Sequence, residues 1–274
     1  MNEMERKSGR DGTVAHREEL ADPAPGIRLS KLTYYSQGLK VKGYLAVPRS
    51  GGPFPGLIYC RGGIRNVGMV TVPRIVTFAR RGCAVFAPFY RGNDGGEGRE
   101  DFGGEDRFDL YNAIRLMREL EEAEDEPPAL VGFSRGALMA LLAAKECDSV
   151  GPVAVWGGVS DLFLTYEERI DLRRMLRRVV GHPVKDAEQY RARSAVFWAD
   201  QIQSPVLIIH GSADERVGVE HALRLAHALE AAGKTYRLQI FPGLPHHFPR
   251  EEDEKALDLI FEWIRCFKTA PRRD

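Results

Sequence analysis

The sequence has few cysteines, no long apolar run and no net charge. Its 4 cysteines lie far apart and form no Cys-x-x-Cys pair, so the sequence predicts neither a disulfide framework nor a zinc site. Isolated thiols inside apolar segments are typical of a reducing compartment, and we expect a cytoplasmic protein. No apolar stretch reaches the roughly 18 residues that a membrane-spanning helix needs. The start, MNEMERKSGRDGTVAHREEL, is charged and lacks the apolar core of a secretory signal.

The charges of the chain cancel, because Lys and Arg total 39 and Asp and Glu also total 39. Such a chain lacks the broad positive field that attracts phosphate backbones, so we expect no nucleic-acid partner, and without an apolar span no membrane partner. No GxGxxG follows the first strand and no GxxxxGK[ST] is present, which argues against a nucleotide-binding protein. The expected partner is a small molecule, and the sequence leaves a homo-oligomer open.

Two kinds of pattern alternate along the chain. Short apolar runs predict buried strands, and segments with apolar residues three and four positions apart predict helices. The runs are FPGLIYC, CAVFAPFY, PALVGFS, PVAVWGG, PVLIIHG and YRLQIF, with segments such as FDLYNAIRLMRELEE between them. Upstream, LTYYSQGLKVKGYLAVP predicts a hairpin that turns at Gln37-Gly38. The alternation predicts an α/β protein with a mostly parallel sheet covered on both faces.

Three regions are distinguished by composition. Residues 1–26 are polar and end in ADPAPG, which predicts a flexible arm or a loosely docked element. Residues 27–274 predict one α/β domain, since 43% of the chain is hydrophobic and can fill a sizeable core. Within that domain the alternation pauses at 160–204. There DLFLTYEERIDLRRMLRRVV predicts a helical insertion, either a cap over the carboxyl edge of the sheet or simply packed helices.

The sharpest chemical signal is Gly132-Phe133-Ser134-Arg135-Gly136, which follows the strand PALV and opens the helix GALMALLAAKE. A serine at such a turn adopts a strained backbone, and the flanking glycines leave room for it. The strain exposes the hydroxyl at the carboxyl edge of the sheet, and the helix N-terminus favours developing negative charge. The sequence therefore predicts Ser134 as a nucleophile.

A serine hydroxyl attacks well only when a base accepts its proton and an acid orients that base. Asp214 comes directly after the strand PVLIIHG, and the loop PGLPHHF after the strand YRLQIF contains His246 and His247. In an α/β architecture with the serine at such a turn, the partners are expected later along the chain, in the order Ser, acid, His. Because each candidate follows a successive strand, we expect them to converge at one edge of the sheet.

Alternatives stay open for both partners of the serine. Adjacent histidines point in different directions, so only one of His246 and His247 can face Ser134. Asp161 is the main rival to Asp214, because it also follows a strand. The less favoured residues are Glu215 beside the acid, His210 at a strand end with an expected structural role, and His182, His221 and His227 on loops or helix faces.

An acyl-transfer site also needs hydrogen-bond donors for the oxyanion. The backbone N–H of Arg135 is one expected donor, and the turn Arg61-Gly62-Gly63 after an early strand supplies the other through Gly63. The guanidinium of Arg61 either adds a substrate-binding donor or forms a structural ion pair. The side chains expected to wall the substrate pocket, with a role as core aromatics equally open, are Trp156, Phe163 and Trp198.

From about Pro55 to the C-terminus, the sequence resembles the catalytic domain of the prolyl oligopeptidase (S9) branch of the α/β-hydrolase superfamily and dienelactone-hydrolase-like proteins. The motifs that carry the resemblance include APFYRGNDGGEGREDFGG, VGFSRGALMA, HGSADERV and FPGLPHHF. In this family the histidine stands in a P-G-x-x-H-x-F loop, which selects His246 over His247. The acid of HGxxDxxV falls on Asp214, and the second glycine of the HGG turn falls on Gly63. The resemblance implies an α/β-hydrolase fold and a Ser-His-Asp triad without a cofactor.

The sequence also departs from the family. Too few residues precede the hydrolase pattern for the β-propeller of the true oligopeptidases, so we expect none. Arg61 replaces a histidine or tyrosine, His247 replaces a small residue, and Pro245 precedes the histidine pair. Small relatives of this build are similar to carboxylesterases. The expected function is therefore hydrolysis of short-acyl carboxylic esters, with a peptidase or acyl-aminoacyl hydrolase second and a non-catalytic binding module third.

Overall fold

The computed structural model describes residues 10–268. Contacts among the described residues define two compact units, which divide between Leu130 and Val131. The sequence predicts one domain over 27–274, and the division falls inside that range, at Leu130. Residues 1–9 of the expected N-terminal arm lie outside the described residues.

Within residues 10–128, strands pair in the order β1-β2-β3-β5-β4. β1, β2, β3 and β5 pair antiparallel, whereas β4 and β5 are parallel. The bounds are β1 Val14–Ala24, β2 Ile27–Ser36, β3 Leu39–Pro48, β4 Gly56–Cys60 and β5 Ala84–Pro88, with helices α2 Val72–Ala79 and α3 Arg107–Glu119. Every residue of β4 and β5 is buried, as their continuous apolar runs predict.

The predicted hairpin is present. β2 and β3 are joined by Gln37 and Gly38, whose φ angles of 50° and 74° suit the tight turns that match strand twist. The polar segment at residues 14–24 forms the strand β1, because its backbone pairs with β2. In this range the expected arm is therefore a strand, and its mostly exposed side chains explain its polar composition.

The second unit carries strands in the order β6-β7-β8-β9, of which β7, β8 and β9 pair in parallel. Their bounds are β6 Ala129–Phe133, which begins at the boundary of the units, β7 Val153–Trp156, β8 Val206–Gly211 and β9 Tyr236–Phe241. The principal helices around them are α4 Arg135–Glu146, α8 Glu220–Ala231 and α9 Arg250–Lys268. Parallel strands end at a common edge, so the loops that follow them meet there.

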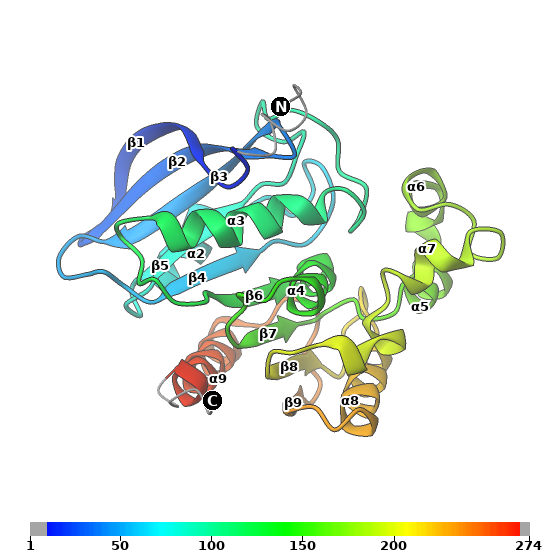
Figure 1. The fold of residues 1–274 in the computed structure, drawn as a ribbon. Coiled ribbons are helices and arrows are strands. Elements are labelled where there is room, and N and C mark those ends of the chain that lie inside the picture. The colour runs from blue at the N-terminus through cyan, green and yellow to red at the C-terminus, as the bar shows by residue number, and fades with distance from the viewer. Residues whose placement is uncertain (1–9, 269–274) are drawn as a thin grey trace. The chain divides into compact units, whose positions relative to one another are not determined.

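Between β7 and β8 the chain is helical, with α5 Leu162–Glu168, η1 Ile170–Leu172, α6 Arg173–Val179, α7 Ala187–Arg191, η2 Ala195–Phe197 and η3 Ala199–Gln201 (Figure 1). Aromatic rings hold the insertion together. The ring centroid of Tyr190 lies 5.2 Å from that of Phe163 and 6.1 Å from that of Tyr166. Whether the insertion caps the site stays a prediction.

Across residues 10–268, no helix combines the length and the apolar character that crossing a membrane requires.

Candidate active site

Ser134 occupies the turn between β6 and α4. Its φ of 55° and ψ of −122° lie outside the regions that a side-chain-bearing residue prefers. Its N–H donates to the carbonyl of Trp156 at 3.0 Å, and its carbonyl accepts the N–H of Ala137 at 3.1 Å. A Cβ atom at position 132 would lie 2.5 Å from the carbonyl oxygen of Gly136, so only glycine fits there. The strained serine turn that the sequence predicts is present.

Asp214 follows β8 and is 8% exposed. Its Oδ1 accepts the backbone N–H groups of Arg216 and Val217, both at 2.9 Å. Its Oδ2 lies 2.7 Å from Nδ1 of His246. Burial favours the neutral acid, but hydrogen bonds from His210 and His246 outweigh it and hold the pKa of Asp214 well below its ordinary value. The carboxylate is therefore kept ionised.

His246 lies in the loop after β9 and is 3% exposed. Because a carboxylate only accepts hydrogen bonds, Nδ1 carries the proton and Nε2 is the basic nitrogen. The ring of Phe133, the residue before Ser134, packs on this imidazole at a centroid distance of 4.8 Å. The packing ties the histidine loop to the serine turn.

Two glycines with no role predicted from the sequence make this arrangement fit. Gly157 has a φ of 53°, and a Cβ there would lie 3.2 Å from both Oδ2 of Asp214 and Nδ1 of His246. A Cβ on Gly211 would lie 2.2 Å from the carbonyl oxygen of Leu244, inside the histidine loop. The sequence signal for these two roles was a glycine at the end of a buried strand: Gly157 follows β7, and Gly211 ends β8. Glycine at a strand end marks a close approach of another backbone segment.

The neighbouring histidine has different surroundings. His247 is exposed, and its ring lies 5.2 Å from Phe133 and 5.1 Å from His246 between centroids. Burial lowers its pKa, and the nearby charges of His246 and Arg216 lower it further. Of the two adjacent histidines, His246 is the one that bonds Asp214.

Asp161, the rival acid, serves a helix. Its Oδ1 accepts the N–H groups of Phe163 and Leu164 at the start of α5, and its Oδ2 lies 3.1 Å from the guanidinium of Arg224. This is the geometry of an N-cap. Glu215 projects outward, with a side chain that is 62% exposed. Neither Asp161 nor Glu215 occupies the place of Asp214 beside His246.

The other histidines of the second unit have distinct places. His221 is buried, and its Nδ1 accepts the N–H of Ser160 at 3.3 Å. His182 accepts the N–H of Val184 at 3.2 Å, and His227 is exposed on α8. His210 is fully buried, and its Nε2 lies 2.7 Å from the carbonyl oxygen of Val217 and 3.4 Å from Oδ2 of Asp214. It therefore reaches the acid that the sequence assigned to the site.

Arg61 forms a buried ion pair in the first unit. Its guanidinium is 1% exposed, lies 2.7 Å from Oε1 of Glu100 and donates to the carbonyls of Gly62 and Phe89. Of the two roles that the sequence left open, the structure shows the ion pair. Gly63 in the same turn has a φ of 64°, and a Cβ there would lie 2.1 Å from the carbonyl oxygen of Val67. The oxyanion roles of Gly63 and Arg135 stay predictions.

The predicted pocket walls take part in packing. Trp156 is 3% exposed and lies 5.1 Å from Phe248 between ring centroids. Trp198 is 4% exposed, and its Nε1 donates to the carbonyl of Arg191. Phe163 is half-buried within the insertion. Their part in substrate binding stays a prediction.

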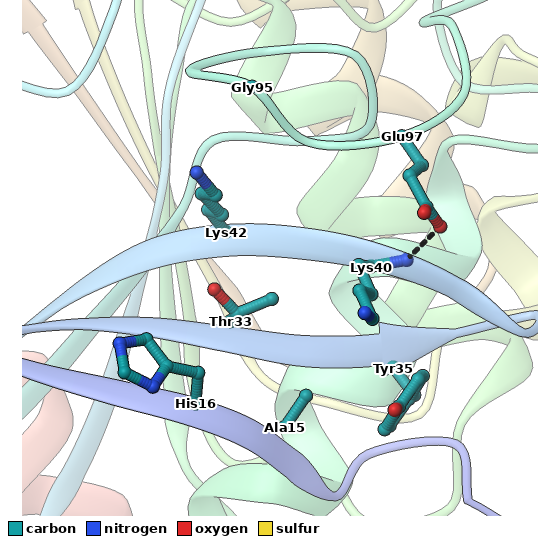
Figure 2. A pocket seen from close by; sticks show the side chains of 8 residues that line it. All are labelled: Ala15, His16, Thr33, Tyr35, Lys40, Lys42, Gly95 and Glu97. Atoms are coloured by element: carbon teal, nitrogen blue, oxygen red, sulfur yellow. Dashed lines mark hydrogen bonds between the residues drawn. The ribbon is translucent and has the colours of Figure 1, made fainter.

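The first unit also holds a polar hollow of about 300 Å³ that the sequence did not indicate (Figure 2). It lies over β1, β2 and β3, under the loop that follows β5, and none of the predicted catalytic residues lines it. The side chains around it include His16, Tyr35, Lys40, Lys42 and Glu97. Lysine and tyrosine on an exposed sheet face are ordinary, and the hollow adds no triad chemistry.

Comparison of the chain with known proteins agrees with the motifs around Ser134, Asp214 and His246. The model of the prolyl oligopeptidase family matches residues 70–268. The chain belongs to the prolyl oligopeptidase family. A curated relative, the uncharacterized peptidase YtmA of Bacillus subtilis, is 42% identical over 254 residues, which are 92% of this chain and 99% of YtmA. The protein is therefore a serine hydrolase of the S9 family.

Solved structures with more distant sequences share the fold. Acylaminoacyl peptidase of Pyrococcus horikoshii is 22% identical with a TM-score of 0.77, over 91% of this chain but only 43% of that enzyme. Acetyl xylan esterase of Paenibacillus sp. R4 is 15% identical with a TM-score of 0.73, over 95% of this chain and 93% of the esterase. These similarities show an α/β-hydrolase fold, with peptidases and esterases among the neighbours.

Proposed function

We propose that this family member hydrolyses carboxylic esters of short acyl groups through an acyl-enzyme. The observation that carries the proposal is the 2.7 Å hydrogen bond between His246 and Asp214, in a loop tied to the serine turn through Phe133. A histidine oriented by an ionised carboxylate, beside a serine held in a strained strand-to-helix turn, is the arrangement that activates a hydroxyl for acyl transfer.

The reaction begins when Oγ of Ser134 attacks the ester carbonyl and Nε2 of His246 accepts the hydroxyl proton. Asp214 stabilises the imidazolium, and the backbone N–H of Arg135 binds the oxyanion. The intermediate collapses to an acyl-serine, and the departing alkoxide takes the proton from His246. Water then attacks the acyl-serine, gives a proton to His246, and releases the acid while Ser134 recovers its hydrogen.

Support for an ester rather than a peptide comes from the structural neighbours. The acetyl xylan esterase matches this chain over 93% of its own length, whereas the acylaminoacyl peptidase matches over 43% of its length. The chain thus resembles an esterase as a whole and the peptidase only in part. The resemblance is one of fold, which hosts both activities, so activity itself must decide.

A peptidase or acyl-aminoacyl hydrolase is the second candidate. One observation favours this candidate. YtmA, of which the chain covers 99%, carries the name of a peptidase. Ester and amide hydrolysis share the same acyl-enzyme route and differ in the leaving group, which His246 must protonate more completely for an amine.

The test is hydrolysis of p-nitrophenyl esters from acetate to decanoate, beside an aminoacyl and an acyl-aminoacyl p-nitroanilide. Ser134→Ala is the control and should lose at least about 10⁴-fold in kcat. Turnover that depends on Ser134 and is greatest for short esters supports the proposal. Comparable turnover of an anilide favours the second candidate. Silence on all substrates, with no labelling by an organophosphate, would leave a non-catalytic module.

We also propose a cytoplasmic location. The described residues include all four cysteines as free thiols, with Cys60 and Cys83 buried. Free thiols are typical of a reducing compartment. Fractionation of source cells with an antibody against the protein tests this, and enrichment in an extracytoplasmic fraction would contradict it.

A further inference from the structure

A second imidazole faces the carboxylate of Asp214. His210 stands near the end of β8, four residues before Asp214, and no part of it is exposed. Its Nε2 lies 3.4 Å from Oδ2 of Asp214, the same oxygen that Nδ1 of His246 approaches at 2.7 Å. The same carboxylate oxygen thus lies near two imidazoles, one from β8 and one from the loop after β9.

The tautomer of His210 follows from its contacts. Nε2 is 2.7 Å from the carbonyl oxygen of Val217, and a carbonyl oxygen only accepts hydrogen bonds, so Nε2 carries the proton. Nδ1 is buried and has no hydrogen-bond partner among residues 10–268. Nothing in that part of the chain therefore favours moving the proton to Nδ1.

One residue links both sides of the arrangement. The N–H of Val217 donates to Oδ1 of Asp214, while its carbonyl accepts the proton of His210. Fixing that carbonyl fixes the turn 214–217 and with it the N–H groups that hold Oδ1. The His210 N–H also lies near Oδ2, where its positive end stabilises the negative charge.

We propose that His210 is a positioning residue for the acid of the triad. It holds the turn through Val217 and faces Oδ2, so that the carboxylate of Asp214 keeps the rotation that presents this oxygen to His246. The terminal torsion of an aspartate is broad, so neighbours must select its orientation. The inference rests on the proposed function, because positioning matters only if Asp214 orients a catalytic base.

Two substitutions separate the N–H group from the bulk of the ring. His210→Phe keeps a ring of similar size without the N–H, whereas the amide of His210→Gln can place an N–H near the position of Nε2. Partners that orient metal ligands in other proteins are worth about 10- to 100-fold, and we expect a fall of this size in kcat for His210→Phe. KM should stay within about twofold, because no substrate contact is removed. His210→Gln should recover most of the loss.

A double-mutant cycle tests whether the effect passes through the carboxylate. In an Asp214→Asn background, His210→Phe should change kcat by less than about twofold, because the group that His210 positions is already neutralised. A further loss as large as that in the wild-type background would overturn the inference. So would a folded His210→Phe variant with unchanged kcat, or a His210→Gln variant no better than His210→Phe.

Nitrogen-15 NMR of histidine-labelled wild-type protein gives an answer even if the Phe variant does not fold. We expect the proton of His210 on Nε2 and a bare Nδ1, and a proton on Nδ1 instead would overturn the inference. Organophosphate labelling distinguishes the two proposals. An unlabelled wild-type enzyme contradicts the proposed function. Wild-type and folded His210→Phe enzymes labelled at equal rates contradict only the role of His210.

Discussion

Nδ1 of His246 lies 2.7 Å from Oδ2 of Asp214, and the two side chains are only 3% and 1% exposed. A hydrogen bond to an ionised group is strong where water is excluded, so this contact fixes the direction of the imidazole. With Nδ1 committed to the acid, Nε2 is left for proton transfer. Several measurable consequences arise from this pairing.

Asp214→Asn should lower kcat by about 10⁴-fold, because an amide in place of the acid favours the wrong imidazole tautomer. Asp161→Asn is the matched control, since this residue caps α5 and binds Arg224. The control should retain turnover and lose at most about 1 kcal/mol of the free energy of unfolding, because asparagine caps a helix as well as aspartate does and the pair with Arg224 is partly exposed. Steady-state kinetics on p-nitrophenyl acetate decides, and the reverse ranking would assign the acid to Asp161.

His246→Gln and His247→Gln form a second matched pair. Of these two residues, only His246 bonds Asp214, so its replacement should remove nearly all turnover, by about 10⁴-fold or more. His247→Gln should keep turnover within about tenfold, because this residue is exposed and contacts the base only through its ring. The organophosphate labelling rate gives an independent readout. Equal losses in both variants would contradict the assignment.

The lowered pKa of Asp214 predicts a loss of stability in acid. Its pKa in the folded state lies below that in the unfolded state, so folding gains stability above the unfolded value of about 4. That gain disappears as the pH falls through the folded-state pKa, because both states are then protonated. Asp214→Asn lacks the titrating group. The difference in unfolding free energy between wild type and this variant should therefore shrink from pH 5 downward in urea denaturation, and a constant difference would contradict the assignment.

The buried ion pair of the first unit should matter far more than an exposed one. Arg61 and Glu100 are each 1% exposed and lie 2.7 Å apart. Glu100→Gln leaves the guanidinium charge buried, so we expect a loss of about 3–5 kcal/mol in unfolding free energy. The control is Arg118→Ala, which breaks an exposed pair with Asp125 and should cost about 1 kcal/mol or less. Chemical denaturation of both variants compares them, and similar losses would contradict the role of the pair.

The backbone strain at Ser134 predicts an unusual response to glycine. In the interior of a helix or strand, Gly is less favourable than Ala, by roughly 0.5–1 kcal/mol. At a φ of 55° and ψ of −122° only glycine is free of strain, so Ser134→Gly should exceed Ser134→Ala in stability by about 1 kcal/mol. Both variants should be inactive, so urea denaturation makes the comparison. Greater stability of the Ala variant would show that the turn is unstrained.

Much of the candidate site was predictable because its signals are local. Ser134 stands between glycines at a strand-to-helix turn, and Asp214 follows the next-but-one strand of the chain. The hydrophobic pattern and the order of the strands along the chain place such residues at one edge of the sheet, since parallel strands end on the same side. The hairpin turn at Gln37-Gly38 was predictable for the same reason, because two adjacent residues decide it.

Contacts between distant residues were not predictable. The sequence left Arg61 open between a substrate donor and an ion pair, and its partner Glu100 lies 39 positions away in a Gly-rich loop. The polar segment 14–24 showed no strand signal, because its order comes from backbone hydrogen bonds to β2 rather than from burial of its side chains. In both cases the partner, not the residue, determines the structure.

The α/β class, the family and the candidate order of nucleophile, acid and base could be predicted from short stretches of sequence. Those follow from hydrophobic periodicity and short motifs, which act over a few residues. The folded chain was needed to show that Asp161 caps a helix while Asp214 meets His246, and that His210 reaches the same carboxylate. Hydrogen bonds act over about 3 Å. Asp214 and His246 are 32 residues apart, so whether they come that close depends on how β8 and β9 pack together.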